Sequence, residues 1–210
     1  MTSTFPTTTT FYLLRHGLPE GDDCLRGQTD FALTKTGWQQ MQRACEQLPQ
    51  IDNIVCSPLS RCATFAKAYA EQQHLPLTFS DDIQEMNFGL WDGEKHELLW
   101  QKFPQELAQF WQSPRSYHPP GGETFSAFEQ RVNHCRQYLL SDHANKTLLL
   151  VTHAGVIRSF LNWALAIAAD NHSMYTALSL PYASVIKITI YQDEHGKYWP
   201  TLHWPGVPSD

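Results

Sequence analysis

The sequence predicts an α/β fold, a three-layer sandwich in which a mostly parallel central sheet carries helices on both faces. Short apolar runs rich in branched side chains alternate with segments of helical period, which is typical of βαβ units. The strongest runs are residues 11–15 (FYLLR), 53–57 (NIVCS) and 147–152 (TLLLVT). Each is short enough for a strand and is followed by a segment long enough for a helix.

Two further apolar runs complete the predicted core of the sheet, at residues 77–80 (LTFS) and 184–191 (SVIKITIY). The turn-forming sequence DEHGK then leads to a last strand near residues 198–204, which contains Pro200. Proline lacks the N–H that an interior strand donates, so this strand is predicted at an edge of the sheet. The threonine tract before residue 11 is predicted to be a frayed lead-in to the first strand.

Helices are predicted from apolar residues at helical spacing and from residues suited to the first turn. They are expected to begin near Thr34, at Pro58, at a capping box of Ser126 with Glu129, and at Val156. The second is expected to end at about Gln72 and the last at Ala169.

Residues 86–125 have no clear strand pattern and are rich in aromatic side chains, which predicts an insertion covering one end of the sheet. No linker, repeat or change of composition divides the chain, so residues 1–210 are expected to form a single domain. A chain of this length buries about 70% of its surface on folding, enough for a core without disulfides or a structural metal.

Charge and composition narrow the function. The formal charge of −6 argues against broad nucleic-acid binding, which needs a basic surface to displace counterions from phosphates. No apolar run approaches the ~18 residues of a membrane span, and the first residues lack the basic start and apolar centre of a signal peptide. The 5 cysteines are odd in number and lack paired zinc spacing, so a reducing cytoplasm is the expected location.

Polar groups follow the three strongest strands at the point where each ends. Arg15 and His16 end the first strand, Ser57 and Arg61 follow the second, and His153 follows the third. Carboxyl ends of parallel strands meet at one edge of a sheet, so these groups are expected together. At an effective dielectric of about 20, each pair of like charges about 4 Å apart costs roughly 4 kcal/mol unless an anion lies between them. Phosphate is the predicted occupant because guanidinium groups match its oxygens two at a time.

The presence of His16 predicts chemistry and not binding alone. A neutral imidazole can attack phosphorus, form a phosphohistidine and be displaced by water. Nearby arginines are expected to lower the pKa of His16 and keep it neutral at pH 7. Glu85, which follows the predicted strand at residues 77–80, is the candidate proton donor for the leaving oxygen. Arg15, Arg61 and His153 would stabilise the charge, so no metal and no cofactor is required.

Four segments occur in the order LLRHG, SPLSR, EMNFGLWDG and LVTHAG over nearly the whole chain. Together they resemble the histidine phosphatase superfamily, which has the phosphoglycerate-mutase-like fold. The resemblance implies that His16 is the phosphorylated nucleophile and that Glu85 is the proton donor. The groups it implies for holding the phosphate are Arg15, Arg61 and His153.

The segment CLRGQTDFALTKTG, residues 24–37, is similar to the segment beside the site in this family, which implies that Arg26 and Gln28 contact the substrate. This segment and the compact length resemble most the α-ribazole-5′-phosphate phosphatases of cobalamin biosynthesis. The implied partner is a small-molecule phosphomonoester. Many members continue as RHGETxxN, and the positions matching Glu, Thr and Asn are here Leu18, Pro19 and Asp22.

Other functions use some of the same residues. A phosphoglycerate mutase or a broad-specificity phosphatase would keep the whole site, although mutase relatives tend to carry a longer insertion. A metallohydrolase could use His16 and His153 as ligands, but no carboxylates occur at ligand spacing. A cysteine phosphatase needs one more residue than the 4 that separate Cys56 from Arg61. A catalytically inactive phosphoester-binding protein is disfavoured because His16 and Glu85 are both present.

Overall fold

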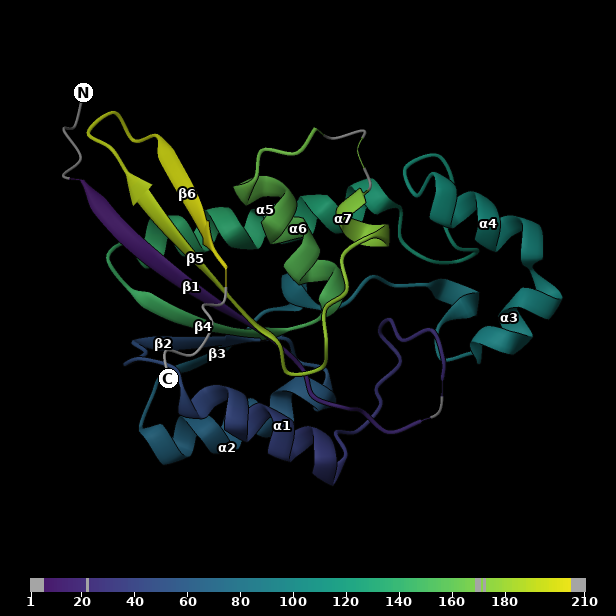
Figure 1. Ribbon diagram of the computed structural model, residues 1–210, viewed down its shortest axis with the longest axis horizontal. Coiled ribbons are helices and arrows are strands. Elements are labelled where there is room, and N and C mark those ends of the chain that lie inside the picture. Colours follow the sequence, from purple (N-terminus) through teal and green to yellow (C-terminus); the bar gives the residue numbers. More distant parts are fainter. Residues whose placement is uncertain (1–5, 22, 169–170, 172, 205–210) are drawn as a thin grey trace.

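The computed structural model describes residues 6–21, 23–168, 171 and 173–204 of the chain. Its strands form one 6-stranded sheet in the order β3-β2-β4-β1-β5-β6 (Figure 1). The first four strands of this order run parallel, whereas β5 is antiparallel to β1 and β6 is antiparallel to β5. The predicted mostly parallel sheet is therefore confirmed. The strands are β1 (Thr7–Arg15), β2 (Asn53–Cys56), β3 (Leu77–Phe79), β4 (Thr147–Thr152), β5 (Val185–Gln192) and β6 (Tyr198–His203).

Strand β1 begins earlier than the sequence predicted. The threonine tract pairs with β5 from Thr7 onward, so the frayed lead-in was a wrong prediction. Threonine is branched at Cβ and favours extended backbone, and a neighbouring strand supplies partners for its backbone groups. Pro200 lies in β6, the strand at one edge of the sheet, as predicted.

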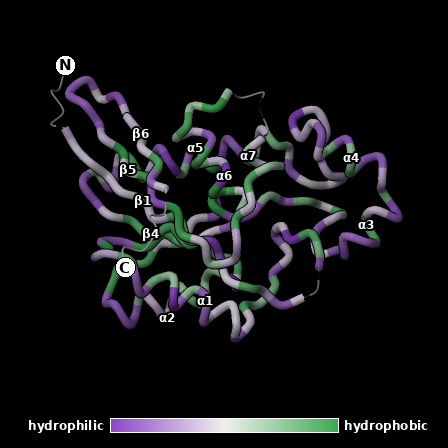
Figure 2. Tube along the Cα trace, in the orientation of Figure 1, coloured by the Kyte–Doolittle hydropathy of each residue, from purple (hydrophilic) through white to green (hydrophobic). Residues whose placement is uncertain are grey.

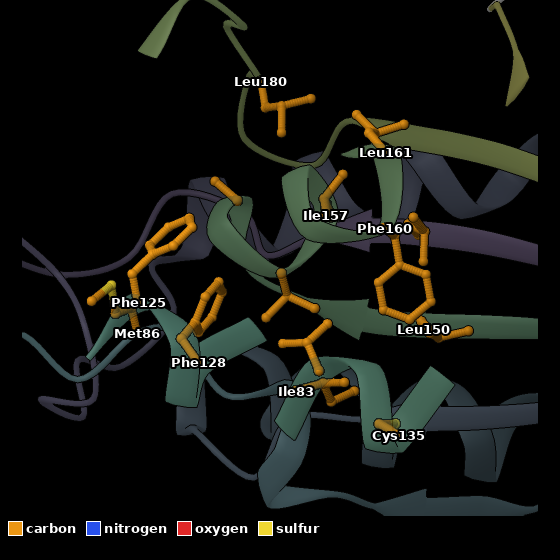
Figure 3. Close-up of a cluster of buried hydrophobic side chains, with 14 of the residues drawn as sticks. Ile83, Met86, Phe125, Phe128, Cys135, Leu150, Ile157, Phe160, Leu161 and Leu180 are labelled. Carbon is orange, nitrogen blue, oxygen red and sulfur yellow. The ribbon is translucent and has the colours of Figure 1, made fainter. Parts of the chain in front are cut away.

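The central strands are buried on both faces because alternate side chains enter two separate cores. From β4, Leu148 and Leu150 enter one core, and Leu149 and Val151 enter the other. Figure 3 shows part of the first core, where Leu150 lies near aromatic and aliphatic side chains of the covering helices. Colouring by hydropathy shows apolar segments gathered along the central strands of the sheet, β4 among them (Figure 2).

Helices cover both faces of the sheet, which completes the predicted sandwich (Figure 1). On one face lie α1 (Lys35–Glu46) and α2 (Ser60–Gln73), and on the other lie α5 (Phe125–Asp142) and α6 (Ala154–Ala164). Thr34 caps α1 as predicted, accepting a hydrogen bond from the Gly37 N–H at 2.9 Å. The predicted end of α2 at about Gln72 is correct to one residue, whereas its start and the bounds of α6 were wrong by a few residues, since α2 spans Ser60–Gln73 and α6 spans Ala154–Ala164.

The predicted capping box at Ser126 is wrong. Thr124 caps α5 by accepting a hydrogen bond from the Ala127 N–H at 3.1 Å. Glu129, the other member of the predicted box, instead forms an ion pair with Arg115. The helix therefore starts at Phe125, whose buried ring packs against Phe128.

The segment 86–125 forms short helices and no regular strand among the elements described, and it lies on the side toward which β1 runs (Figure 1). Trp91 is fully buried at its centre, where its ring stacks on Tyr117 and meets Phe110 edge-on. Its helical elements are the 3₁₀ turn η2 (Gly89–Trp91), α3 (His96–Lys102) and α4 (Pro104–Gln112). Elsewhere the chain forms η1 (Asp81–Ile83) and α7 (Ser173–Thr176).

Candidate active site

The register of the central strands brings the predicted polar groups to one end of the sheet. Arg15 of β1 lies beside Thr152 of β4, and Val151 of β4 lies beside Cys56 of β2. The residues that follow these strand ends are His16, His153 and Ser57. The rings of His16 and His153 are 5.2 Å apart between centroids, tilted by 59°.

Two arginines complete this group, which we call the strand-end cluster: Arg15, His16, Arg61 and His153. Arg61 is fully buried, and the charges of Arg61 and Arg15 both act to lower the pKa of each imidazole. Four cationic or titratable side chains in a largely buried position create a strong preference for an anion.

His16 has the protonation state that attack on phosphorus requires. Its Nδ1 is 2.8 Å from the Gly17 carbonyl oxygen, which can only accept, so Nδ1 carries the hydrogen and the lone pair lies on Nε2. Burial, followed by the charge of Arg61, lowers the pKa of His16 to about 3. The predicted direction of this shift is correct, but burial is a larger cause than the arginines on which the prediction depended.

His153 occupies the position just before the first residue of α6 and is fully buried. Its Nε2 lies 2.8 Å from the Ser57 hydroxyl, whereas Nδ1 is buried without a hydrogen-bond partner among the described residues. Burial, with a further contribution from Arg61, holds the pKa of His153 well below its usual range. The ring is therefore neutral and has one nitrogen left for a bound molecule.

The two guanidinium groups are oriented by the backbone around them. Arg61 donates to the carbonyl oxygens of Thr29 at 3.0 Å and Gly27 at 2.5 Å. Arg15 donates to the Leu180 carbonyl, and its guanidinium lies 4.2 Å from the centroid of the Tyr182 ring. Each guanidinium has five N–H donors, so both retain donors for an anion after these bonds are made.

Glu85 is nearly buried and lies beside the start of α6. Its carboxylate accepts hydrogen bonds from the N–H groups of Met86 and Gly155, both at 3.0 Å. A Cβ atom at Gly155 would lie 2.2 Å from the carboxylate, so only glycine admits Glu85 at this place. Gly17 has a similar reason to be glycine, because a Cβ there would lie 2.1 Å from the Gly37 carbonyl oxygen.

Arg26 and Gln28 lie on the segment that Arg61 holds. The side chain of Gln28 donates to the Glu85 carbonyl oxygen at 3.3 Å, which places it beside the candidate proton donor. Arg26 donates to the Gly21 carbonyl oxygen at 2.7 Å and contributes to the lowered pKa of His16. Both residues therefore lie near the strand-end cluster, and their contact with substrate remains a prediction.

Sequence reasoning missed three residues that shape the site. Asp92 accepts hydrogen bonds from the N–H groups of Gly27, Gln28 and Thr29 at 2.6 to 3.1 Å and so fixes their segment. Arg131 of α5 donates to the carbonyl oxygens of residues 84 and 85 at 2.7 and 2.9 Å.

The third is Tyr182, whose ring lies 5.7 Å from the His16 ring. It precedes the antiparallel strand β5, so it reaches the site from a strand's amino end. A search restricted to carboxyl ends of strands passes over it. An aromatic residue just before an antiparallel neighbour of the first strand is the signal that would have found it.

The residues that depart from the family pattern pack against protein. The Leu18 N–H donates to the Gln40 side chain at 2.9 Å, and Pro19 forms an isolated bridge with Leu33. Asp22 lies outside the described residues. Within the described part of the chain, no three His, Cys, Asp or Glu side chains gather as a metal-binding group, and no helix is long and apolar enough to cross a membrane.

Comparison with known proteins agrees with this fold. The family model of the histidine phosphatase superfamily (branch 1) matches residues 11–198. The chain therefore belongs to this superfamily. Membership supports the activity of a phosphoric monoester hydrolase. Its sheet and helices match solved structures of the same fold, as the alpha-ribazole phosphatase from Shigella flexneri illustrates, with a TM-score of 0.80 and 26% identity over 92% of this chain and 94% of that one.

Curated relatives share the sequence at modest identity. A bifunctional protein of Mycobacterium tuberculosis is 32% identical over 192 residues, which are 89% of this chain and 52% of the relative. The chain thus spans about half the length of this relative. An adenosylcobalamin/alpha-ribazole phosphatase of Escherichia coli is 27% identical over 163 residues, covering 76% of this chain and 80% of the relative.

Proposed function

We propose that the chain is a metal-independent phosphomonoesterase that works through a phosphohistidine on His16. One observation carries the proposal: a neutral imidazole, with its Nε2 lone pair free, lies buried among two guanidinium groups and a second imidazole. A site that only bound phosphate would need donors and no lone pair beside phosphorus. A nucleophile surrounded by donors is the arrangement that phosphoryl transfer requires.

The reaction has two steps. In the first, Nε2 of His16 forms a bond to phosphorus, the bond to the leaving oxygen breaks, and Glu85 gives that oxygen its proton. In the second, Glu85 takes a proton from water, the water oxygen attacks phosphorus, and the N–P bond breaks to return His16 to its neutral form. Arg15, Arg61 and His153 donate hydrogen bonds to the phosphoryl oxygens in both steps.

The proposed substrate is α-ribazole 5′-phosphate, which makes the enzyme part of cobalamin biosynthesis. The names of the similar phosphatases support this choice, and so does a cavity of about 70 Å³ beside Glu85. Half of the residues that line it are aromatic: Phe88, Phe110, Trp111, Phe125, Phe128 and Tyr175. A cavity of ~150 Å³ holds one benzene ring, so an aromatic base would enter only in part and lie against the rim.

Arg158 gives the same cavity a polar group. It lines the wall and donates to the Leu178 carbonyl oxygen at 2.8 Å, while its buried Nε has no partner among the described residues. An acceptor atom on the leaving group would satisfy this donor. A cytoplasmic location is also part of the proposal, because Cys45, Cys56, Cys62 and Cys135 are buried free thiols.

A panel of phosphate monoesters tests the function. Wild type, His16→Ala and the exposed control His195→Ala are assayed on α-ribazole 5′-phosphate, O-phosphoserine and 4-nitrophenyl phosphate, each with and without a chelator. We expect turnover in chelator, a loss of about 10³-fold or more in His16→Ala, and no loss in the control. Activity that a chelator abolishes and a divalent metal restores would favour the metallohydrolase and contradict the proposal.

Further measurements separate the neighbouring functions. An acid-labile label from a radioactive phosphoester is expected on wild type during turnover and on no residue of His16→Ala. Isomerisation of 3-phosphoglycerate in the presence of a bisphosphoglycerate primer would indicate the mutase. Equal rates on α-ribazole 5′-phosphate and 4-nitrophenyl phosphate would indicate a phosphatase of broad specificity. A protein that hydrolyses no substrate of the panel would be a phosphoester-binding protein.

A further inference from the structure

Ser57 is a fully buried hydroxyl beside the strand-end cluster, and the reaction described above does not use it. Its Oγ lies 2.8 Å from Nε2 of His153. A hydroxyl can donate or accept, and an imidazole nitrogen does either according to its tautomer. The groups around the pair decide which of the two atoms supplies the hydrogen.

The surroundings of Ser57 favour its hydroxyl as the donor. The Leu59 N–H, which can only donate, is directed to the same Oγ at 3.4 Å, so the oxygen already accepts one hydrogen. The hydroxyl hydrogen still needs an acceptor, because an unsatisfied buried donor costs about 1–3 kcal/mol. Nε2 of His153 is the acceptor that the described residues offer at hydrogen-bond distance.

Cys62 is the competing neighbour. Its Sγ lies 3.7 Å from Nε2 of His153, but its S–H is directed to the Thr152 carbonyl oxygen at 3.5 Å. Sulfur is a weak acceptor. Burial raises the pKa of Cys62 to about 12, so no thiolate is present to attract a hydrogen from Nε2.

The other nitrogen of the ring supports the same assignment. Nδ1 of His153 is buried and has no partner among the described residues. If Nε2 accepts from Ser57, the neutral ring carries its hydrogen on Nδ1 and offers a donor to a phosphoryl oxygen. The opposite tautomer would place a lone pair against that oxygen, and the two would repel.

We infer that Ser57 is a positioning residue, whose hydroxyl donates to Nε2 of His153 and thereby holds this histidine in the Nδ1–H tautomer that binds a phosphoryl oxygen. The inference rests on the proposed function only in taking phosphate as the anion of the site. It assigns Ser57 no contact with the reacting atoms.

Nitrogen NMR of the protein labelled with ¹⁵N-histidine tests the inference without any change at Ser57. The signals of His153 are assigned by their loss in His153→Asn. We expect the wild-type spectrum to show a protonated Nδ1 and an unprotonated Nε2 for this residue. A wild-type protein in which Nε2 carries the hydrogen would overturn the inference.

Variants then test the cause. Ser57→Ala is expected to give a mixture of tautomers at His153 and to weaken the binding of inorganic phosphate by about 10- to 100-fold, as for other groups that orient a ligating histidine. Ser57→Thr keeps the hydroxyl and is expected to restore both. Cys62→Ala is the control and is expected to leave the tautomer unchanged.

Each outcome bears on one conclusion. An unchanged tautomer in Ser57→Ala, or a changed one in Cys62→Ala, would overturn the role of Ser57 even if phosphate binding weakened. A protein that hydrolyses no phosphoester but shows the expected tautomers and phosphate affinities would contradict the proposed function and leave the role of Ser57 intact.

Discussion

At the scale of single residues, burial sets the charge on which the site depends. His16 is held neutral chiefly because its ring is removed from water, with the arginines adding to the effect. The sequence predicted a neutral His16 because it placed the arginines nearby. It could not show how deeply the ring is buried, because burial depends on packing among segments far apart in the chain.

This neutrality has an energetic cost at acidic pH. The pKa of His16 is about 3 in the folded protein and has an ordinary value of 6.5, so below pH 6.5 the unfolded chain binds a proton that the folded one does not. His16 therefore lowers the free energy of unfolding as the pH falls from 6.5 toward 3, by at most ~1.4 kcal/mol per pH unit. In urea denaturation, we expect the free energy of unfolding of His16→Asn to increase relative to that of wild type as the pH falls from 7 to 5. The exposed His195→Asn is expected to show no such trend. A difference that is the same at both pH values would contradict this.

The carboxylate of Glu85 depends on the missing side chain of Gly155. In Gly155→Ala the new methyl group is expected to displace the carboxylate and lower kcat by about 10²-fold or more, the usual contribution of a general acid. The displaced group is the end of a flexible side chain, so the fold is expected to remain. The effect of Gly155→Ala on kcat is measured in two backgrounds, the wild-type protein and Glu85→Gln. If the methyl group acts through Glu85, it has little further effect in the second background, and an equal loss in both would exclude this cause.

At the scale of elements, apolar runs, turn residues and helical spacing predicted the six strands of the described residues and the four long helices, but they predicted the ends of these elements less well. The two caps illustrate the difference. At Thr34 a single candidate precedes the apolar positions, and the prediction is correct. Before α5 two candidates lie close together, and the choice depends on which aromatic residue enters the core. Phe125 is buried at the first helical position, so the helix starts two residues earlier than the Ser126 box would place it.

The true cap of α5 can be measured as a difference in stability. Thr124→Ala removes the acceptor of the Ala127 N–H and is expected to lower the free energy of unfolding by about 1 kcal/mol. Ser126→Ala, two residues further on, is expected to change it by less than ~0.5 kcal/mol because serine is no better than alanine inside a helix. Both are compared with wild type in urea denaturation. A larger loss of unfolding free energy in Ser126→Ala than in Thr124→Ala would indicate that Ser126 is the cap.

At the scale of the whole molecule, the site combines two kinds of strand end. Parallel strands supply the strand-end cluster, and their convergence follows from a general rule that the sequence alone can invoke. Antiparallel β5 supplies Tyr182 from its amino end, which no rule about parallel sheets includes. Asp92 and Arg131 were missed for another reason, since each acts on backbone groups whose positions exist only in the folded chain.

The single domain predicted from the uniform composition is a proposal at this scale. The β5 strand pairs with β1 along nearly its whole length, so the two ends of the described chain are held in one sheet. We expect one cooperative transition in thermal or urea unfolding, with circular dichroism and tryptophan fluorescence changing together. Because Trp91 and Trp199 lie in the insertion and in β6, the fluorescence reports on both regions. Transitions that separate between the two probes would indicate independent units.

The pairing of β1 with β5 also matters during synthesis. Leu180, which accepts a hydrogen bond from Arg15, lies 165 positions after it, so the ribosome makes Leu180 and Tyr182 long after the side chain that they hold. Until those residues leave the exit tunnel, the first strand lacks its antiparallel neighbour and the guanidinium lacks its support. A nascent chain that has not yet released Tyr182 therefore lacks the contacts that orient Arg15.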